Sequence, residues 1–223
     1  MRQVAYPGLR ITIVLFSLIL AAMIIVGAAL LQVDDPVYLK QLIEDAGPVQ
    51  LVGQTAIFIA FGLACVFALI DNERRVVYTQ LSYLLMFYAL READYHYKVS
   101  EHAKATQFKR FFSHELIPLS SKLFLAAIVI LFLLVMYRYL KTQRPAFMAA
   151  LRDRLPWALC VLAWAGVFFM SQAVDQIPIF HNVTGQVFEE IFESSAEILA
   201  LLAMILFRVQ LRAPSVTPGQ SAT

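Results

Sequence analysis

Two stretches of this chain carry side chains that can bind cations or transfer protons. Residues 91–98 read Arg-Glu-Ala-Asp-Tyr-His-Tyr-Lys and end a long apolar run. A second apolar run contains four glutamates: Glu189, Glu190, Glu193 and Glu197. Carboxylates and neutral imidazoles bind divalent metals and also act as general acids and bases. Both stretches together therefore predict a site for metal or proton chemistry.

The first stretch has helical spacing that favours a shared ligand. Glu92 and His96 are four residues apart, so on a helix they share a face. Asp94 would point about 160° away from His96 and is expected to bind Arg91 or Lys98. If the helix ends after Asp94, the side chains of Glu92, Asp94 and His96 could converge on one ligand. The alternative is an ordinary cluster of charges and tyrosines at the end of a membrane span.

The glutamates of the second stretch gather on one side of a helix. Counted from Gly185, Glu193 lies about 12 Å and Glu197 about 18 Å along the axis, close to a bilayer midplane. Glu190 falls on the same face, within roughly 60° of both. Inserting one acid at mid-helix costs about 2.5–3.5 kcal/mol, so we expect these acids to face protein, water or a cation. A structural alternative is pairing with basic side chains of other helices: Arg91, Lys98 or Lys122.

These residue types favour a metal-assisted hydrolase of a lipid or lipid-linked substrate. Glu190, Glu193 and Asp94 are the candidate catalytic residues, and Glu197 is a candidate proton relay. A divalent zinc, iron or manganese ion would take its ligands from five residues: Glu92, His96, Asp175, His181 and Glu189. Basic side chains would bind the substrate's head group: Arg91, Lys109 and Arg110. The sequence has no HExxH motif and no paired Glu-x-x-His motif of di-iron bundles.

Two functions without catalysis remain open. The acids could relay protons or bind a cation in a transporter component, which at this chain length we expect to form a homo-oligomer. The chain could also be an accessory or sensor subunit, since histidines titrate near physiological pH.

Composition places these residues in a membrane protein. The chain of 223 residues is 60% hydrophobic and 15% charged, with a mean hydropathy of +0.69; soluble domains are about 45–50% apolar and 25% charged. Its net charge of +2, without a long basic run, argues against nucleic acid as a partner and leaves membrane lipids. We predict one all-α domain over residues 1–212 and a disordered tail over 213–223.

Six apolar segments are long enough to cross about 30 Å of hydrocarbon: residues 9–31, 49–70, 76–97, 119–140, 156–174 and 185–208. The first is too long for a signal-peptide core and is expected to be a retained span. Asp35-Pro36 predicts the start of a short helix along the interface, which Gly47-Pro48 would end. Residues 71–75 predict a tight turn, residues 104–116 a basic amphipathic interfacial helix, and residues 141–156 a loop.

Charge distribution predicts the orientation of the spans. Eleven of the 18 Lys and Arg residues lie with the two termini on one side, so both termini are expected in the cytoplasm of a bacterial inner membrane protein. Thirteen of the 16 Asp and Glu residues, and all four histidines, fall on the other side or in the outer half of a span. The predicted site therefore opens outward.

Overall fold

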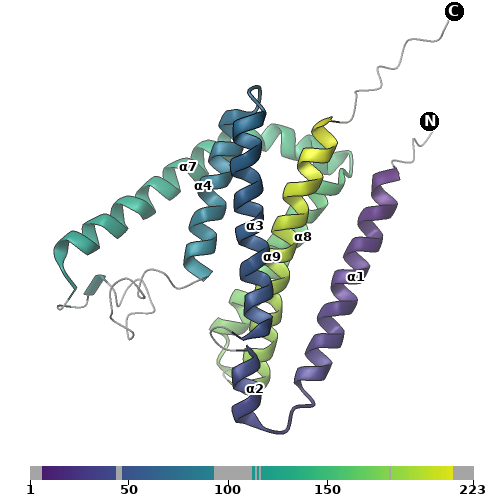
Figure 1. Cartoon of the computed structure of the whole chain (residues 1–223), viewed down its shortest axis with the longest axis vertical. Helices are drawn as coiled ribbons and strands as arrows, with labels where there is room; N and C mark the ends of the chain where they lie inside the picture. Colours follow the sequence, from purple (N-terminus) through teal and green to yellow (C-terminus); the bar gives the residue numbers. More distant parts are fainter. Residues whose placement is uncertain are drawn as a thin grey trace, which may run out of the picture.

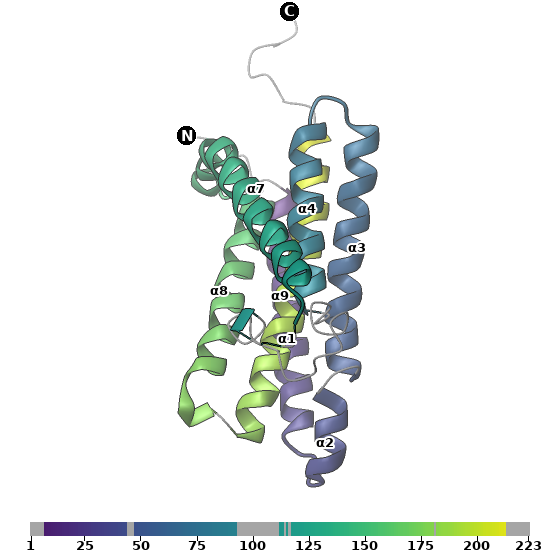
Figure 2. The same ribbon diagram turned by 90° about the vertical axis from the view of Figure 1, so that its left-hand side faces the viewer.

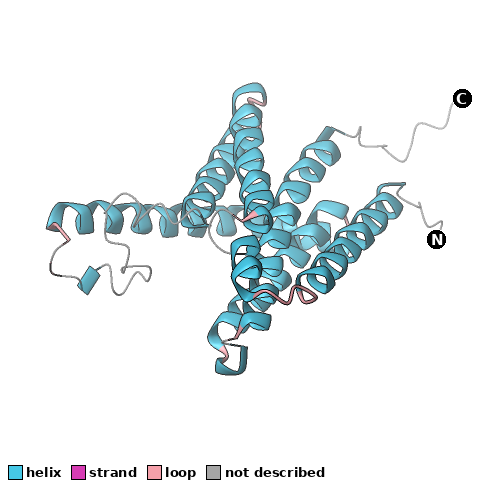
Figure 3. Cartoon of the chain, turned by 60° about the horizontal axis from the view of Figure 1, so that its bottom comes forward, coloured by secondary structure: helices cyan, strands magenta, loops and turns pink. Residues whose placement is uncertain are grey.

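The computed structural model describes residues 7–43, 47–92, 112–113, 115, 117–180 and 182–212, whose regular structure is entirely helical (Figure 3). Within these ranges lie six long helices: α1 (Pro7–Leu30), α3 (Pro48–Ile70), α4 (Arg75–Glu92), α7 (Leu119–Arg152), α8 (Pro156–Gln176) and α9 (Val183–Arg212). In the described part of the chain, four candidate membrane spans have the required length and composition: Thr12–Leu30, Val37–Ile70, Leu119–Arg152 and Pro156–Gln176. The chain is therefore an integral membrane protein.

Helices α4 and α9 are long but are not among the four most apolar ones, which differs from the six apolar spans predicted. The charges of Arg75, Arg91 and Glu92 lie within the 18 residues of α4, and α9 carries its four glutamates. Helix α9 runs through the middle of the bundle, packed along α8 and α3 and touching α1 (Figures 1 and 2). Its polar side chains can therefore be covered by protein.

Helices α3 and α4 form an antiparallel hairpin closed by the predicted tight turn. Pro48 occupies the first turn of α3, where its missing N–H costs nothing. At the other end the Asp71 carboxylate accepts a hydrogen bond from the Arg74 backbone N–H at 3.1 Å. Ala60 and Ala64 are fully buried, and this small-residue side of α3 lets neighbouring helices approach closely.

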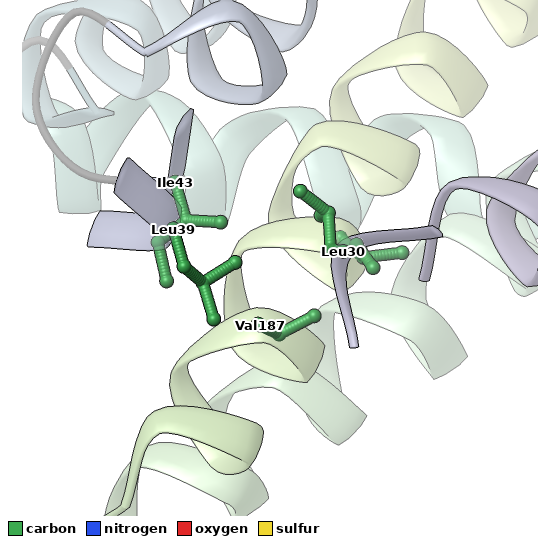
Figure 4. Close-up of a cluster of buried hydrophobic side chains, with 5 residues drawn as sticks. Leu30, Leu39, Ile43 and Val187 are labelled. Carbon is green, nitrogen blue, oxygen red and sulfur yellow. The ribbon is translucent and has the colours of Figure 1, made fainter. Parts of the chain in front are cut away.

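The predicted short helix is α2 (Pro36–Ile43), and its start is capped as expected. The Asp35 carboxylate accepts a hydrogen bond from the Val37 N–H at 2.9 Å, as an N-cap residue does. Its apolar face packs into the bundle, because Leu39 and Ile43 are buried against Val187 of α9 (Figure 4). Helix α2 thus covers one end of α9.

The prediction of a loop over residues 141–156 was wrong in its first part. Helix α7 continues through Pro145 to Arg152. Proline removes one backbone hydrogen bond, but the helix-forming residues that follow it, residues 146–151, sustain the helix. At 34 residues, α7 is about 51 Å long, more than the thickness of a hydrocarbon core. It is strongly inclined to the other long helices (Figures 1 and 2).

The turn from α7 to α8 has an unusual backbone. Leu155 N–H donates to Ala150 C=O at 2.8 Å and Arg154 N–H donates to Leu151 C=O at 3.0 Å, the two bonds of a Schellman motif. Arg154 has φ 54°, the left-handed conformation for which glycine is preferred at this position. An L-residue there costs roughly 1–2 kcal/mol.

Several predictions concern residues outside the described ranges. These are the end of the third span at residues 93–97, most of the amphipathic helix over 104–116, and the tail 213–223.

Candidate functional site

The acidic helix α9 begins at a well-defined cap. The Asn182 side chain accepts a hydrogen bond from the Gly185 N–H at 2.9 Å and donates one to the Ile179 carbonyl at 3.0 Å. A Cβ at Gly185 would lie 2.7 Å from the carbonyl carbon of Phe180, so only glycine fits against this turn. The start of α9, and with it the register of its glutamates, is therefore fixed by local contacts.

Glu193 is fixed by a hydroxyl from the neighbouring helix. The Ser171 Oγ of α8 donates a hydrogen bond to Glu193 Oε1 at 3.1 Å. Ser171 is fully buried, so its hydroxyl has no bulk water to compete for that bond. The carboxylate of Glu193 consequently lies between α8 and α9.

Glu197 lies one turn further along α9 and points toward α3. It is only 2% exposed, and its carboxylate lies against Gly53. A Cβ on Gly53 would approach Ser194 Cα to 2.7 Å, so the backbones of α3 and α9 are very close here. The Ser194 hydroxyl donates to the Val49 carbonyl at 2.8 Å and joins the same two helices. The expectation that this acid avoids lipid holds.

The two glutamates nearer the start of α9, Glu189 and Glu190, are half-buried. Asp175 is exposed at the end of α8, where it accepts a hydrogen bond from the Gln176 side chain at 2.6 Å. Arg91 lies at the end of α4 with its guanidinium carbon 5.7 Å from the centre of the Phe168 ring of α8. An aromatic face attracts a cation, so Phe168 helps to hold Arg91 beside the α8–α9 pair.

The histidines and the remaining basic residues of the predicted site are not placed. Asp94, His96, Lys109, Arg110 and His181 lie outside the described residues. Glu92 ends α4, but its side chain is not described. Among the described residues, no three His, Cys, Asp or Glu side chains lie close enough together to hold a metal ion. The acids of α9 therefore do not make a metal site without further ligands, and the predicted ligand set stays a prediction.

An apolar groove of about 310 Å³ runs between α1, α8 and α9. Its walls include Phe16 and Leu20 of α1, Val167 of α8 and Leu199 of α9. Val167 is one helical turn from Ser171, so the groove lies about one turn along α8 from the Ser171–Glu193 hydrogen bond.

Three residues of this region were not singled out from the sequence as site residues: Ser171, Ser194 and Gly53. Small and hydroxylated residues are common inside membrane helices, where they allow close approach and bond between helices. Their residue types therefore did not show that they contact the acids of α9. Only the register between α3, α8 and α9 shows this.

A second charged cluster, also not predicted, lies toward the other end of α9. Arg208 forms an ion pair with Asp71 and donates to the Tyr78 hydroxyl oxygen at 3.5 Å. Its guanidinium carbon lies 5.2 Å from the centre of the Phe67 ring. Desolvation would raise the pKa of Asp71, but the hydrogen bonds from Arg208 and from the Arg74 N–H outweigh it and hold that pKa below its usual value. We call these residues the arginine cluster: Phe67, Asp71, Tyr78 and Arg208.

No protein-family model, curated protein or solved structure matches this chain.

Proposed function

We propose that all six long helices cross the membrane, with both termini in the cytoplasm. Helix α4 is 18 residues long, about 27 Å, and α9 is 30 residues long, about 45 Å, so both can span about 30 Å of hydrocarbon, α4 with a small mismatch. Protein covers Glu197 fully and the other three glutamates of α9 in part, which lowers the cost of placing this helix in a bilayer. The excess of Lys and Arg on the side of the termini supports this orientation.

Cysteine labelling tests the topology. In a chain carrying Cys65→Ala and Cys160→Ala, we expect His181→Cys to react with a membrane-impermeant maleimide on intact cells. Arg144→Cys, an exposed position of α7, should react only after lysis. The opposite pattern would overturn the proposed orientation.

For the activity, we propose an outward-facing metal-assisted hydrolase that acts on a lipid or lipid-linked substrate. The observation that supports it best is the position of the α9 acids inside a membrane bundle. Glu193 is fixed by a buried hydroxyl, and Glu197 is enclosed between α3 and α9. Burying several acids on one face is costly unless protons or cations compensate them, so such acids are expected to be functional.

In this proposal each part of the chain has a defined task. Glu190 or Glu193 accepts the proton of the attacking water. Arg91, held against Phe168, binds an anionic head group together with Lys109 and Arg110. The apolar groove between α1 and α8 takes the acyl chain at the depth below that head group. A divalent metal, if held by Glu92, His96, Asp175, His181 and Glu189, would lower the pKa of its bound water toward about 7.

Elemental analysis of the detergent-solubilised protein is the decisive measurement. About one zinc, iron or manganese per chain is expected, with loss of the metal in both His96→Ala and Glu189→Gln. Glu73→Gln, an exposed acid beyond the end of α3, is the control that should keep the metal. A metal-free wild-type protein, or metal retained in both site variants, would exclude the metal-assisted hydrolase.

The burial of Glu197 favours a second candidate, a proton- or cation-relaying transporter component. A hydrolase working near the surface has no need of an acid two turns deeper than Glu190, whereas a relay does. Proteoliposomes with an internal pH dye would then acidify under an imposed potential, and Glu197→Gln would stop this flux. Equal flux in wild type, variant and empty vesicles would exclude the relay.

A further inference from the structure

A second cavity among the described residues lies far from the glutamates, where α7 turns into α8. Its volume is about 430 Å³, within the range of small-molecule sites. Helices α7 and α8 are candidate membrane spans that end here, so the cavity lies near a membrane–water interface. Its walls combine charged, amide and aromatic side chains: Arg74, Gln143, Asp153, Trp157, Phe207 and Gln210.

The polar groups of this cavity fit a head group that carries both a phosphate and hydroxyl donors. Arg74 supplies a guanidinium, which binds phosphate through charge-assisted hydrogen bonds. Asp153 supplies a carboxylate acceptor. Gln210 supplies a second acceptor, because its Oε1 atom is buried and accepts no hydrogen bond from the described part of the chain. A buried carbonyl oxygen of this kind needs a donor, and a ligand hydroxyl would provide one.

The backbone of Arg154 is an independent sign of function. Arg154 lies between Asp153 and Leu155, which both line the cavity, and its side chain is exposed. It holds a left-handed position that glycine would occupy without strain. Strain of this kind clusters at ligand sites, and here it occurs at an arginine between two residues of the cavity wall. Arg144 and Arg152 are also exposed on this end of α7.

We propose that this cavity binds the head group of an anionic phospholipid that carries a hydroxyl, such as phosphatidylglycerol. Arginines beside a pocket between membrane helices suit anionic lipid head groups. Trp157 and Phe207 form an apolar wall, with Trp157 5.0 Å from Phe207 between ring centroids, and the exposed apolar sides of α7 and α8 accommodate the chains. This site is separate from the acids of α9 and does not depend on the activity proposed for them.

Native mass spectrometry of the full-length protein in a neutral detergent tests the proposal. We expect one phosphatidylglycerol per chain, bound in preference to phosphatidylcholine, which has no hydroxyl and no net charge. Glycerol phosphate, the soluble counterpart of the head group, should bind much more weakly. Equal binding of both lipids, or glycerol phosphate binding as tightly as the lipid, would overturn the assignment.

Arg154→Gly separates binding from folding. Because glycine relieves the left-handed backbone, the melting temperature should stay the same or rise, while the bound lipid fraction falls by about fivefold or more. Arg74→Gln should also lose lipid. Arg138→Gln removes an exposed arginine of α7 that does not line the cavity and should keep it. If Arg138→Gln lost as much lipid as Arg154→Gly, lipid binding would depend only on the general positive charge of this region. The cavity would then be excluded as the binding site.

Discussion

Helix α9 carries charge into the bundle at two places, and the surrounding helices treat these two places differently. At Arg208 the cation meets the carboxylate of Asp71, a tyrosine hydroxyl and two aromatic faces. At Glu197 and Glu193, about 16 and 22 Å back along the helix, carboxylates follow each other with one helical turn between them. The first arrangement balances opposite charges, while the second concentrates charges of one sign.

This difference separates a structural role from a functional one. The arginine cluster ties the α3–α4 turn to α9 through an ion pair and contacts with aromatic rings. The acidic segment gains less from its arrangement, because like charges at helical spacing repel each other. Buried acids of this kind are often functional, so we expect this segment to bind a ligand or transfer protons.

Arg208→Met should strongly destabilise the protein. Methionine keeps the apolar volume but leaves Asp71 in a half-buried position without its main cation, and the aromatic contacts lose their charge. We expect the melting temperature in detergent to fall by more than about 5 °C. Arg138→Met, at an exposed position of α7, is the control and should have little effect. If both substitutions lowered the melting temperature equally, the arginine cluster would not be a specific source of stability.

Gly53→Ala should disturb the acidic segment without removing any charge. The added methyl would meet Ser194 and the Glu197 carboxylate, and overpacking of this kind costs about 1–3 kcal/mol. Gly62→Ala lies on the same helix but has open space around the new Cβ, so it should be neutral or stabilising by up to about 1 kcal/mol. Comparable loss of stability in both variants would contradict the close approach of α3 and α9.

Much of this fold follows from the sequence because it depends on local signals. The apolar runs predicted the starts of the long helices to within about two residues, a usual uncertainty for helix boundaries. Asp35 and Pro36 predicted the start of α2, since capping and proline geometry involve only neighbouring residues. The acids of α9 were identified from their helical spacing and the insertion cost of charge.

The rest depends on register between distant segments. Asp71 and Arg208 are 137 residues apart, and nothing in either neighbourhood indicates the partner. The hydrogen bond from Ser171 to Glu193 depends on the register between α8 and α9. The sequence could not predict it, because a serine in an apolar run has many possible roles. The end of α7 was predicted too early because proline usually ends a helix. In the structure the helix continues through Pro145, since the residues on both sides favour a helix.

Neutralising one acid in each region should change stability in opposite directions. Asp71→Asn removes the partner of Arg208 and should lower the melting temperature. Glu197→Gln keeps the shape but removes one of several like charges from the interior, so we expect a rise of about 2–4 °C. Thermal unfolding of both variants at neutral pH measures this. A fall for Glu197→Gln would indicate that Glu197 also stabilises the fold.

The pH dependence of the arginine cluster has a defined sign. Because the folded-state pKa of Asp71 lies below its ordinary value of 3.8, its carboxylate contributes stability above that ordinary value. This contribution is lost as the pH falls through the lower, folded-state pKa. The difference in melting temperature between wild type and Asp71→Asn should thus be constant from about pH 7 to 5 and shrink toward pH 3. A difference that stays unchanged at pH 3 would exclude Asp71 as the titrating group.

Ser171→Ala should have the smallest effect, about 0.5–1.5 kcal/mol, because it removes one hydrogen bond and little volume. Ser120→Ala, at an exposed position of α7, is the control and should be neutral. The informative measurement is a pair of double-mutant cycles by thermal unfolding. Ser171→Ala and Glu193→Gln share a contact, so their effects should not add, whereas Ser171→Ala and Asp71→Asn belong to separate regions and should add. Coupling in the second cycle would mean that the two charged regions of α9 act as one unit, and the contrast between a structural and a functional region would have to be abandoned.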